Sequence, residues 1–362
     1  MSQKNKLLVS TRKGLVVYEY NSHNKWNYSG VHFLGFPVSM AYVDNSNNTW
    51  WACLDHGHWG SKLHKSSDEG KSWQEVNTPK YPEGEEVKEG VPASLNYLWA
   101  MTSVKSGNST HLFIGTEPGG LFKSVDDGDT FNLVRGLWDH PSRKHQWFGG
   151  GRDHPGIHSI VIDPSNNDHI FVAISCAGVF ETTDGGTTWN PKNHGLKADF
   201  LPDPNSEIGQ DPHLLVACQS NIEVMWQQNH CGIFRTTDGG NNWKDISDKT
   251  GEANFGFAIA ADPVNEKMAW VVPAISDQIR VAVDNSLCVC RTQDGGRTWE
   301  TFRNGLPQGQ SFDITYRHAL SQDEETLVFG TTTGNLYISN DYGETLNCLN
   351  HNLPMIHCVE FV

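Results

Sequence analysis

Short apolar segments alternate with turn-forming residues along the whole chain. In one representative stretch, residues 157–163 (IHSIVID) are mainly apolar, residues 164–168 (PSNND) favour a turn, and residues 169–175 (HIFVAIS) are apolar again. A short connection at 176–178 then leads into a third apolar segment, a polar turn and a fourth segment. The spacing of three and four residues that marks an amphipathic helix is missing. The pattern therefore predicts successive units of four β-strands.

The polar turn between the third and fourth strands repeats along the chain. Each copy has Ser or Thr, then Asp two residues later, Gly after two more, and an aromatic residue in all but the last copy. The aspartates are residues 68, 126, 184, 238, 294 and 341. The Asp side chain can accept hydrogen bonds from its own turn, and Gly supplies a positive φ. We interpret the motif as a folding device, because the calcium-loop alternative at 126–129 lacks a later bidentate Glu and flanking helices.

Repeats of this length, with four strands each, are typical of β-propeller blades. The six turns define six blades, and both chain ends supply a seventh. Residues 6–10 and 15–20 predict its middle strands, residues 21–26 a degenerate turn, and residues 356–361 the missing strand. Pairing the two ends removes both open sheet edges, which a six-bladed ring would leave unpaired. The sequence predicts an all-β fold, a single seven-bladed β-propeller domain over residues 1–362, with Asp-box hairpins and a closed ring.

Charge and cysteine usage narrow the classes of partner. The 362 residues include 27 Lys and Arg against 42 Asp and Glu, a net charge of −15. This charge argues against nucleic acid and against an anionic membrane as partners. The eight cysteines show no zinc-site spacing, and the chain start lacks a secretion signal. We expect reduced thiols in a cytoplasmic protein that acts on a small molecule or an oligosaccharide.

Histidines gather in the connections expected on one face of the propeller. Strand alternation assigns them there, although each histidine taken alone is better explained as an ordinary hydrogen-bonded side chain. As a group they predict a divalent metal, zinc or manganese, with an open coordination position. The expected ligands are His158, His213 and His230, with His58 or Gln228 completing the set.

The same face is expected to carry acid–base groups and substrate contacts. The candidate catalytic carboxylates are Asp153, Asp313 and Glu117. Asp153 has an alternative role as the cap of a turn before Pro155. Arginines bind anions in bidentate fashion, exposed aromatic rings stack on sugars, and glycines 149–151 let a ligand approach the backbone. The candidate substrate-binding residues are Arg12, His56, Trp59, Trp147, Phe148, Arg152, His154 and Arg280.

Several longer stretches resemble one family. They are the six Asp boxes together with 55–58 (DHGH), 137–143 (LWDHPSR), 147–151 (WFGGG), 154–158 (HPGIH), 211–213 (DPH), 232–240 (GIFRTTDGG) and 316–319 (YRHA). They resemble a bacterial group of Asp-box, or BNR-repeat, propeller proteins of the glycosyl hydrolase and exo-α-sialidase-like type. The resemblance implies a sialidase-like or glycosidase-like hydrolase. Two alternatives stay open: a metal-dependent lyase or hydrolase, and a binding scaffold without catalysis.

Overall fold

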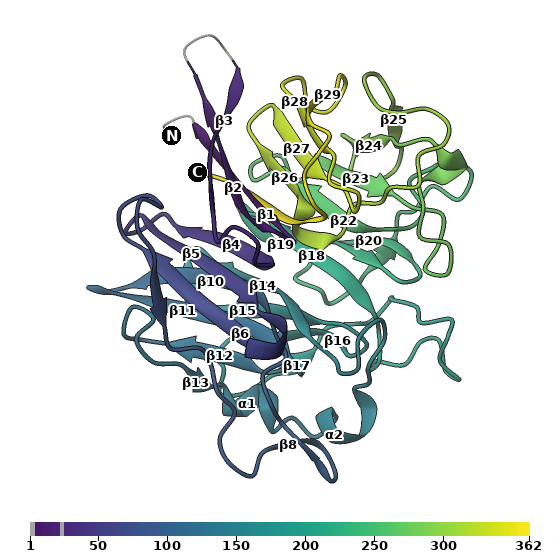
Figure 1. Ribbon diagram of the computed structural model, residues 1–362. Coiled ribbons are helices and arrows are strands. Elements are labelled where there is room, and N and C mark those ends of the chain that lie inside the picture. Colours follow the sequence, from purple (N-terminus) through teal and green to yellow (C-terminus); the bar gives the residue numbers. More distant parts are fainter. Residues whose placement is uncertain (1–3, 22–24) are drawn as a thin grey trace. The chain divides into compact units, whose positions relative to one another are not determined.

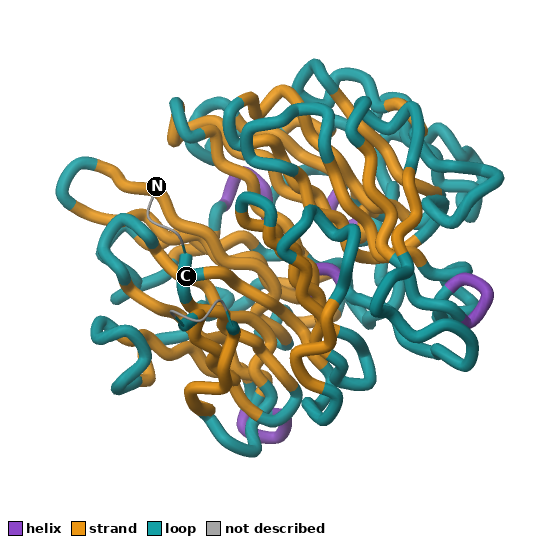
Figure 2. The backbone as a smooth tube through the Cα atoms, turned by 90° about the horizontal axis from the view of Figure 1, so that it is seen from above, coloured by secondary structure: helices purple, strands orange, loops and turns teal. Residues whose placement is uncertain are grey.

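The computed structural model describes residues 4–21 and 25–362. Within these residues the protein is an all-β, seven-bladed β-propeller whose blades are four-stranded antiparallel sheets. Strands and loops make up nearly all of the backbone (Figure 2). The described residues contain two α-helices, each of four residues, α1 (Arg135–Trp138) and α2 (Arg143–Gln146). None of their helices is long and apolar enough to cross a membrane.

The chain divides into two compact units, which we describe separately. The first comprises residues 1–41, 216–235 and 245–362. It contains three complete sheets. The first consists of β3 (Trp26–His32), β2 (Gly14–Tyr20), β1 (Lys6–Thr11) and β30 (Ile356–Phe361). The second consists of β22 (Gly256–Ala261), β23 (Ala269–Pro273), β24 (Val289–Thr292) and β25 (Glu300–Phe302), and the third of β26 (Leu320–Asp323), β27 (Thr326–Gly330), β28 (Leu336–Ser339) and β29 (Asn347–Asn350). Its 3₁₀ turns are η2 (Val283–Asn285) and η3 (Arg317–Ala319).

The second unit comprises residues 42–215 and 236–244. Its complete sheets are β10 (Tyr97–Ser106), β11 (Ser109–Glu117), β12 (Leu121–Ser124) and β13 (Asn132–Leu133), and β14 (Ile157–Asp163), β15 (Asn166–Ile174), β16 (Gly178–Thr182) and β17 (Asn190–Pro191). It also contains β5 (Thr49–Asp55), β6 (Ser61–Ser66) and β7 (Gln74–Val76), whose sheet is completed by β4 (Val38–Asp44), a strand that spans the boundary between the units at residue 42. The long connection after β7 carries the ribbon β8 (Glu86–Lys88) and β9 (Val91–Pro92), and η1 (Gly57–Trp59) follows β5.

One further blade supplies the candidate site. Its strands are β18 (Pro212–Cys218), β19 (Asn221–Asn229), β20 (Gly232–Thr236) and β21 (Lys244–Asp245), in that order across the sheet. The β18–β19 hairpin turns over only two residues, so the start of β18 and the end of β19 lie at the same edge of the blade.

The two ends of the chain build one blade, as the sequence predicts. The C-terminal strand β30, yellow in Figure 1, pairs with the purple N-terminal strand β1, with Leu7 opposite Phe361 and Val9 opposite Val359. These four side chains are buried together in one apolar cluster. The predicted degenerate turn at 21–26 includes residues 22–24, which lie outside the described residues.

The repeated polar turn forms a closed hydrogen-bond network in each copy. In the third copy, Thr182 Oγ1 donates to Asp184 Oδ1 at 2.8 Å and accepts from the Gly186 amide at 3.0 Å. Asp184 also accepts from the amide and the hydroxyl of Thr188, at 2.8 and 2.7 Å. The aromatic residue that follows, Trp189, is buried in the core. The motif therefore stabilises its own turn by internal hydrogen bonds, and the fourth strand of the blade begins directly after it.

The strand that follows the 164–168 segment begins earlier than the sequence predicts. β15 starts at Asn166, because Asp163 and Asn166 already face each other across a two-residue turn. Asp163 Oδ1 accepts hydrogen bonds from the amide and the hydroxyl of Ser165, which stabilises this shorter turn. Turn-forming residues thus occupy ladder positions that composition alone assigns to a loop.

Candidate functional site

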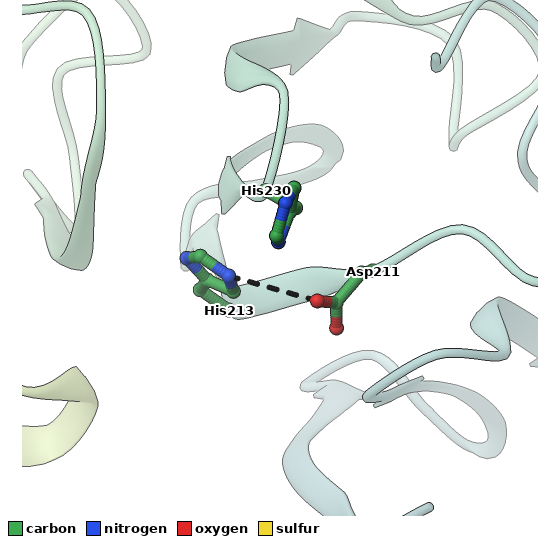
Figure 3. A group of neighbouring side chains, drawn as sticks. All are labelled: Asp211, His213 and His230. Carbon is green, nitrogen blue, oxygen red and sulfur yellow. Dashed lines mark ion pairs between the residues drawn. The ribbon is translucent and has the colours of Figure 1, made fainter. Parts of the chain in front are cut away.

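Two histidines and an aspartate come together at the edge of the β18–β19 hairpin. Asp211 directly precedes β18, His213 is its second residue, and His230 directly follows β19. One ligand atom of each side chain lies within 4.8 Å of the others. Figure 3 shows the three side chains around one small region, with the Asp211–His213 ion pair dashed. Two imidazoles and a carboxylate form a donor set that suits a divalent transition metal.

Contacts within the second unit orient Asp211. The Cys176 amide donates to Asp211 Oδ1 at 3.1 Å, and Asp211 Oδ2 lies 3.7 Å from His213 Nε2. Asp211 is 8% exposed and His213 is 2% exposed. A Cβ atom on Gly150 would lie 2.6 Å from the Cys176 sulfur and 4.0 Å from Asp211 Oδ2. The glycine therefore keeps the space beside this carboxylate free of side-chain atoms.

His158, one of the expected metal ligands, is occupied by hydrogen bonds. Its Nε2 lies 2.8 Å from the Pro212 carbonyl oxygen, and its Nδ1 lies 2.9 Å from the Ser159 hydroxyl. A carbonyl can only accept, so Nε2 carries the proton and Nδ1 accepts from Ser159. The same hydroxyl accepts from the Leu215 amide at 3.0 Å. The ring therefore links β14 to β18, and of the four expected ligands the structure groups only His213 and His230.

A second cluster lies in the second unit around Arg152. Its guanidinium lies 4.1 Å from the Tyr97 ring centre and 4.9 Å from that of Trp99. Its Nη1 donates to Glu117 Oε2 at 2.7 Å. Glu117 is 3% exposed, so the guanidinium compensates a buried carboxylate. A Cβ on Gly156 would lie 2.3 Å from the Trp99 ring, so only glycine fits beside it.

Beside this cluster, the connection after α2 lines a pocket of about 100 Å³. Phe148, Asp153 and His154 contribute to its wall. Phe148 is 36% exposed and meets the Phe200 ring edge-on at 6.3 Å. Trp147 differs from the stacking surface that the sequence predicts: it is buried, and its Nε1 donates to Ser142 Oγ at 2.9 Å. Both rings line the pocket, and Phe148 is the more exposed of the two.

Other expected site residues are held by local contacts. Asp313 is 5% exposed and accepts hydrogen bonds from Thr333 and, at 2.8 Å, from Asn335 Nδ2, so it fastens the connection between β27 and β28. Arg280 pairs with Asp277 and lies 5.2 Å from the Phe257 ring centre.

The remaining expected residues are mostly exposed at the surface. Arg12 is exposed in the β1–β2 turn. In and beside η1, His56 is half-buried, His58 meets the Trp59 ring edge-on at 5.2 Å, and Trp59 is 72% exposed.

Sequence reasoning missed three residues of these clusters. Asp211 lies in the stretch 211–213 (DPH), where an acid two positions before a strand histidine is the available signal. Tyr97 and Trp99 are also two residues apart at the start of a strand, which favours one shared face. Neither spacing reveals that Arg152 lies against both rings.

Comparisons with known proteins give distant relatives. No protein-family model matches the chain. A xyloglucanase of Paenibacillus sp is 23% identical over 85% of this chain and 29% of its own length. A xyloglucanase of Hypocrea jecorina is 24% identical over 65% of this chain and 28% of its own. This chain therefore spans less than a third of each relative.

Solved structures agree with the propeller fold. The GH74 enzyme of Niastella koreensis aligns with a TM-score of 0.63 and 17% identity, over 96% of this chain and 52% of that enzyme. At such identity the likeness concerns the fold.

Proposed function

We propose that this protein is a glycoside hydrolase that acts on a glucan oligosaccharide or polysaccharide. The observation that carries the proposal is the similarity to a xyloglucanase over 85% of this chain. The sialidase-like alternative, which the Asp-box turns suggest, requires an anionic sugar. The chain covers less than a third of the length of these relatives, so its own residues must also account for substrate binding.

The pocket beside α2 supports sugar binding. Phe148 presents a partly exposed ring, which suits stacking on the apolar face of a sugar. Asp153 is exposed and His154 half-buried at the same pocket. Hydrolysis needs one group to protonate the departing glycosidic oxygen and another to take a proton from the attacking water. We assign Asp153 to one of these tasks.

Glu117 and Arg152 take a supporting role in this proposal. The Glu117 carboxylate is buried and paired with Arg152, which leaves it poorly placed to exchange a proton with substrate. Arg152 is half exposed and lies over Tyr97 and Trp99, so its remaining donors can reach sugar hydroxyls. Loss of Glu117 is therefore expected to raise KM by displacing Arg152.

The test is hydrolysis by the purified protein of xyloglucan, xyloglucan oligosaccharides, cello-oligosaccharides and sialyllactose, followed by chromatography of the products. We expect cleavage of a glucan, and we expect Asp153→Asn to lower kcat by about 100-fold or more. The matched control is Asp168→Asn, an exposed aspartate in β15 that lies outside the pocket. Cleavage of sialyllactose alone would favour the sialidase-like alternative, and no cleavage of any sugar would favour a binding scaffold.

A second candidate is metal-dependent cleavage by a lyase or hydrolase. The grouping of Asp211, His213 and His230 favours it. A lyase needs a uronic acid and leaves an unsaturated product that absorbs ultraviolet light. Incubation with polyuronates in the presence and absence of a chelator distinguishes this candidate from metal-independent hydrolysis.

A further inference from the structure

We propose that Asp211, His213 and His230 bind one divalent transition-metal ion, of the zinc or manganese class, with at least one coordination position left for water or a ligand. The three ligands belong to one hairpin and its flanking residues, so metal binding does not depend on whether the protein cleaves glycosidic bonds.

The three side chains supply donor atoms that transition metals prefer. A carboxylate and two imidazoles suit Zn²⁺ and Mn²⁺, and three protein ligands leave a further position open. Metal–ligand bonds of about 2.0–2.2 Å place neighbouring ligand atoms roughly 3–3.5 Å apart. The ligand atoms lie within 4.8 Å of one another, so those farthest apart would approach by roughly 1.3–1.8 Å on binding an ion. Side-chain rotation is the expected source of this movement.

The carboxylate is oriented before any ion binds. The Cys176 amide holds Asp211 Oδ1, which leaves Oδ2 on the side of His213. The 3.7 Å between Asp211 Oδ2 and His213 Nε2 is longer than a hydrogen bond. Outer-shell hydrogen bonds of this kind fix ligating groups in metal sites.

Gln228 supplies an independent observation. It is completely buried in β19, and neither its amide oxygen nor its amide nitrogen has a hydrogen-bond partner among the described residues. Buried amides are normally paired, so this one indicates an additional ligand or ordered water. Gln228 lies in β19 two positions before His230, which belongs to the turn after the strand. An amide this close in sequence to His230 is available to bind the ion or to hydrogen-bond to a water on it.

His230 also borders a pocket of about 440 Å³ within the first unit, together with polar residues that include Lys249, Asn254 and Asp277. An ion bound by His230 is thus exposed to molecules that enter this pocket. Lys249 lies 3.0 Å from Asp245, so its charge is partly compensated.

The experiment measures metal binding by the full chain, without reference to catalysis. Protein purified without chelator is analysed for bound elements, stripped with EDTA, and titrated by calorimetry with ZnCl₂, MnCl₂ or CoCl₂ alone. We expect one equivalent of metal per chain. We also expect tetrahedral or five-coordinate Co²⁺ absorption bands and a rise in Tm on adding metal, because the folded state alone binds it.

The variants are His230→Asn, in the turn directly after β19, and Asp211→Asn. Each is expected to weaken binding at least tenfold and to abolish the metal-dependent rise in Tm. The matched control is His111→Asn, a half-buried histidine of β11 outside the group, which is expected to bind metal like the wild type. If Asp211→Asn fails to fold, His230→Asn carries the test, and circular dichroism reports its folding.

Failure to take up a stoichiometric amount of any of the three metals would overturn the proposed site, as would wild-type affinity in folded His230→Asn. Absence of glucan cleavage by protein that binds one equivalent of metal would overturn the proposed hydrolase and leave the metal site intact. The two proposals therefore fail separately.

Discussion

Replacement of Glu360 by glutamine is expected to stabilise the protein above neutral pH and to leave it unchanged in mild acid. Glu360 lies in β30 opposite Leu8, in the blade that joins the chain ends. Burial raises the pKa of its carboxyl from 4.5 to about 7, with Lys4 opposing the change and Asp323 adding to it. The folded state therefore binds this proton more tightly than the unfolded chain does.

The sign of the pH dependence follows from linkage. The stability that the protonated carboxyl contributes is complete below about pH 4.5 and is lost as pH rises through about 7. At about 1.4 kcal/mol for each tenfold change in proton affinity, the two pKa values give an upper limit of about 3.5 kcal/mol. Because the side chain is only half-buried, water screens the charge, and we expect about 1–2 kcal/mol.

Urea unfolding of wild type and Glu360→Gln at pH 4 and pH 8.5 measures this difference. The variant should match the wild type closely at pH 4, below the pKa of the unfolded chain, and unfold at higher urea at pH 8.5, with an unchanged slope. Glu325→Gln, at an exposed glutamate, is the control and should change stability little at either pH. Equal effects of Glu360→Gln at both pH values, or destabilisation at pH 8.5, would refute the reasoning.

Three further predictions concern the scaffold. Hydrogen bonds from Thr130 lower the pKa of Asp126 to about 2, so Asp126→Asn should cost about 1 kcal/mol in urea unfolding at pH 7 and progressively less as pH falls toward 2. Gly334→Ala should destabilise by several kcal/mol, because the added Cβ would lie 1.5 Å from a backbone oxygen. Gly309 has a similar positive φ but open space around it, so Gly309→Ala should lose only the stability that backbone strain costs, about 1 kcal/mol. Similar losses of stability in Gly334→Ala and Gly309→Ala would contradict the steric argument. Trp270 is fully buried and its Nε1 donates to a backbone carbonyl at 2.7 Å, so Trp270→Ala should cost about 3–5 kcal/mol, and a loss below 1 kcal/mol would contradict its core role.

Local pattern determined the blades of this protein. Apolar alternation and the repeated polar turn predict four strands per repeat, because strand pairing across short turns depends on residues close in sequence. The pairing of β1 with β30 was predictable too, since an N-terminal blade that lacks one strand and a leftover C-terminal strand complete each other. Those inferences need no knowledge of distant side-chain contacts.

The site depended on tertiary structure. A histidine in a strand looks alike in sequence whether it binds a ligand or a backbone carbonyl. His158 proves to be held by the Pro212 carbonyl, 54 positions away, whereas His213 and His230 meet Asp211 at the edge of one hairpin. Whether a histidine contacts a carbonyl or a carboxylate depends on the paths of the loops around it. Packing between residues far apart in the chain determines those paths.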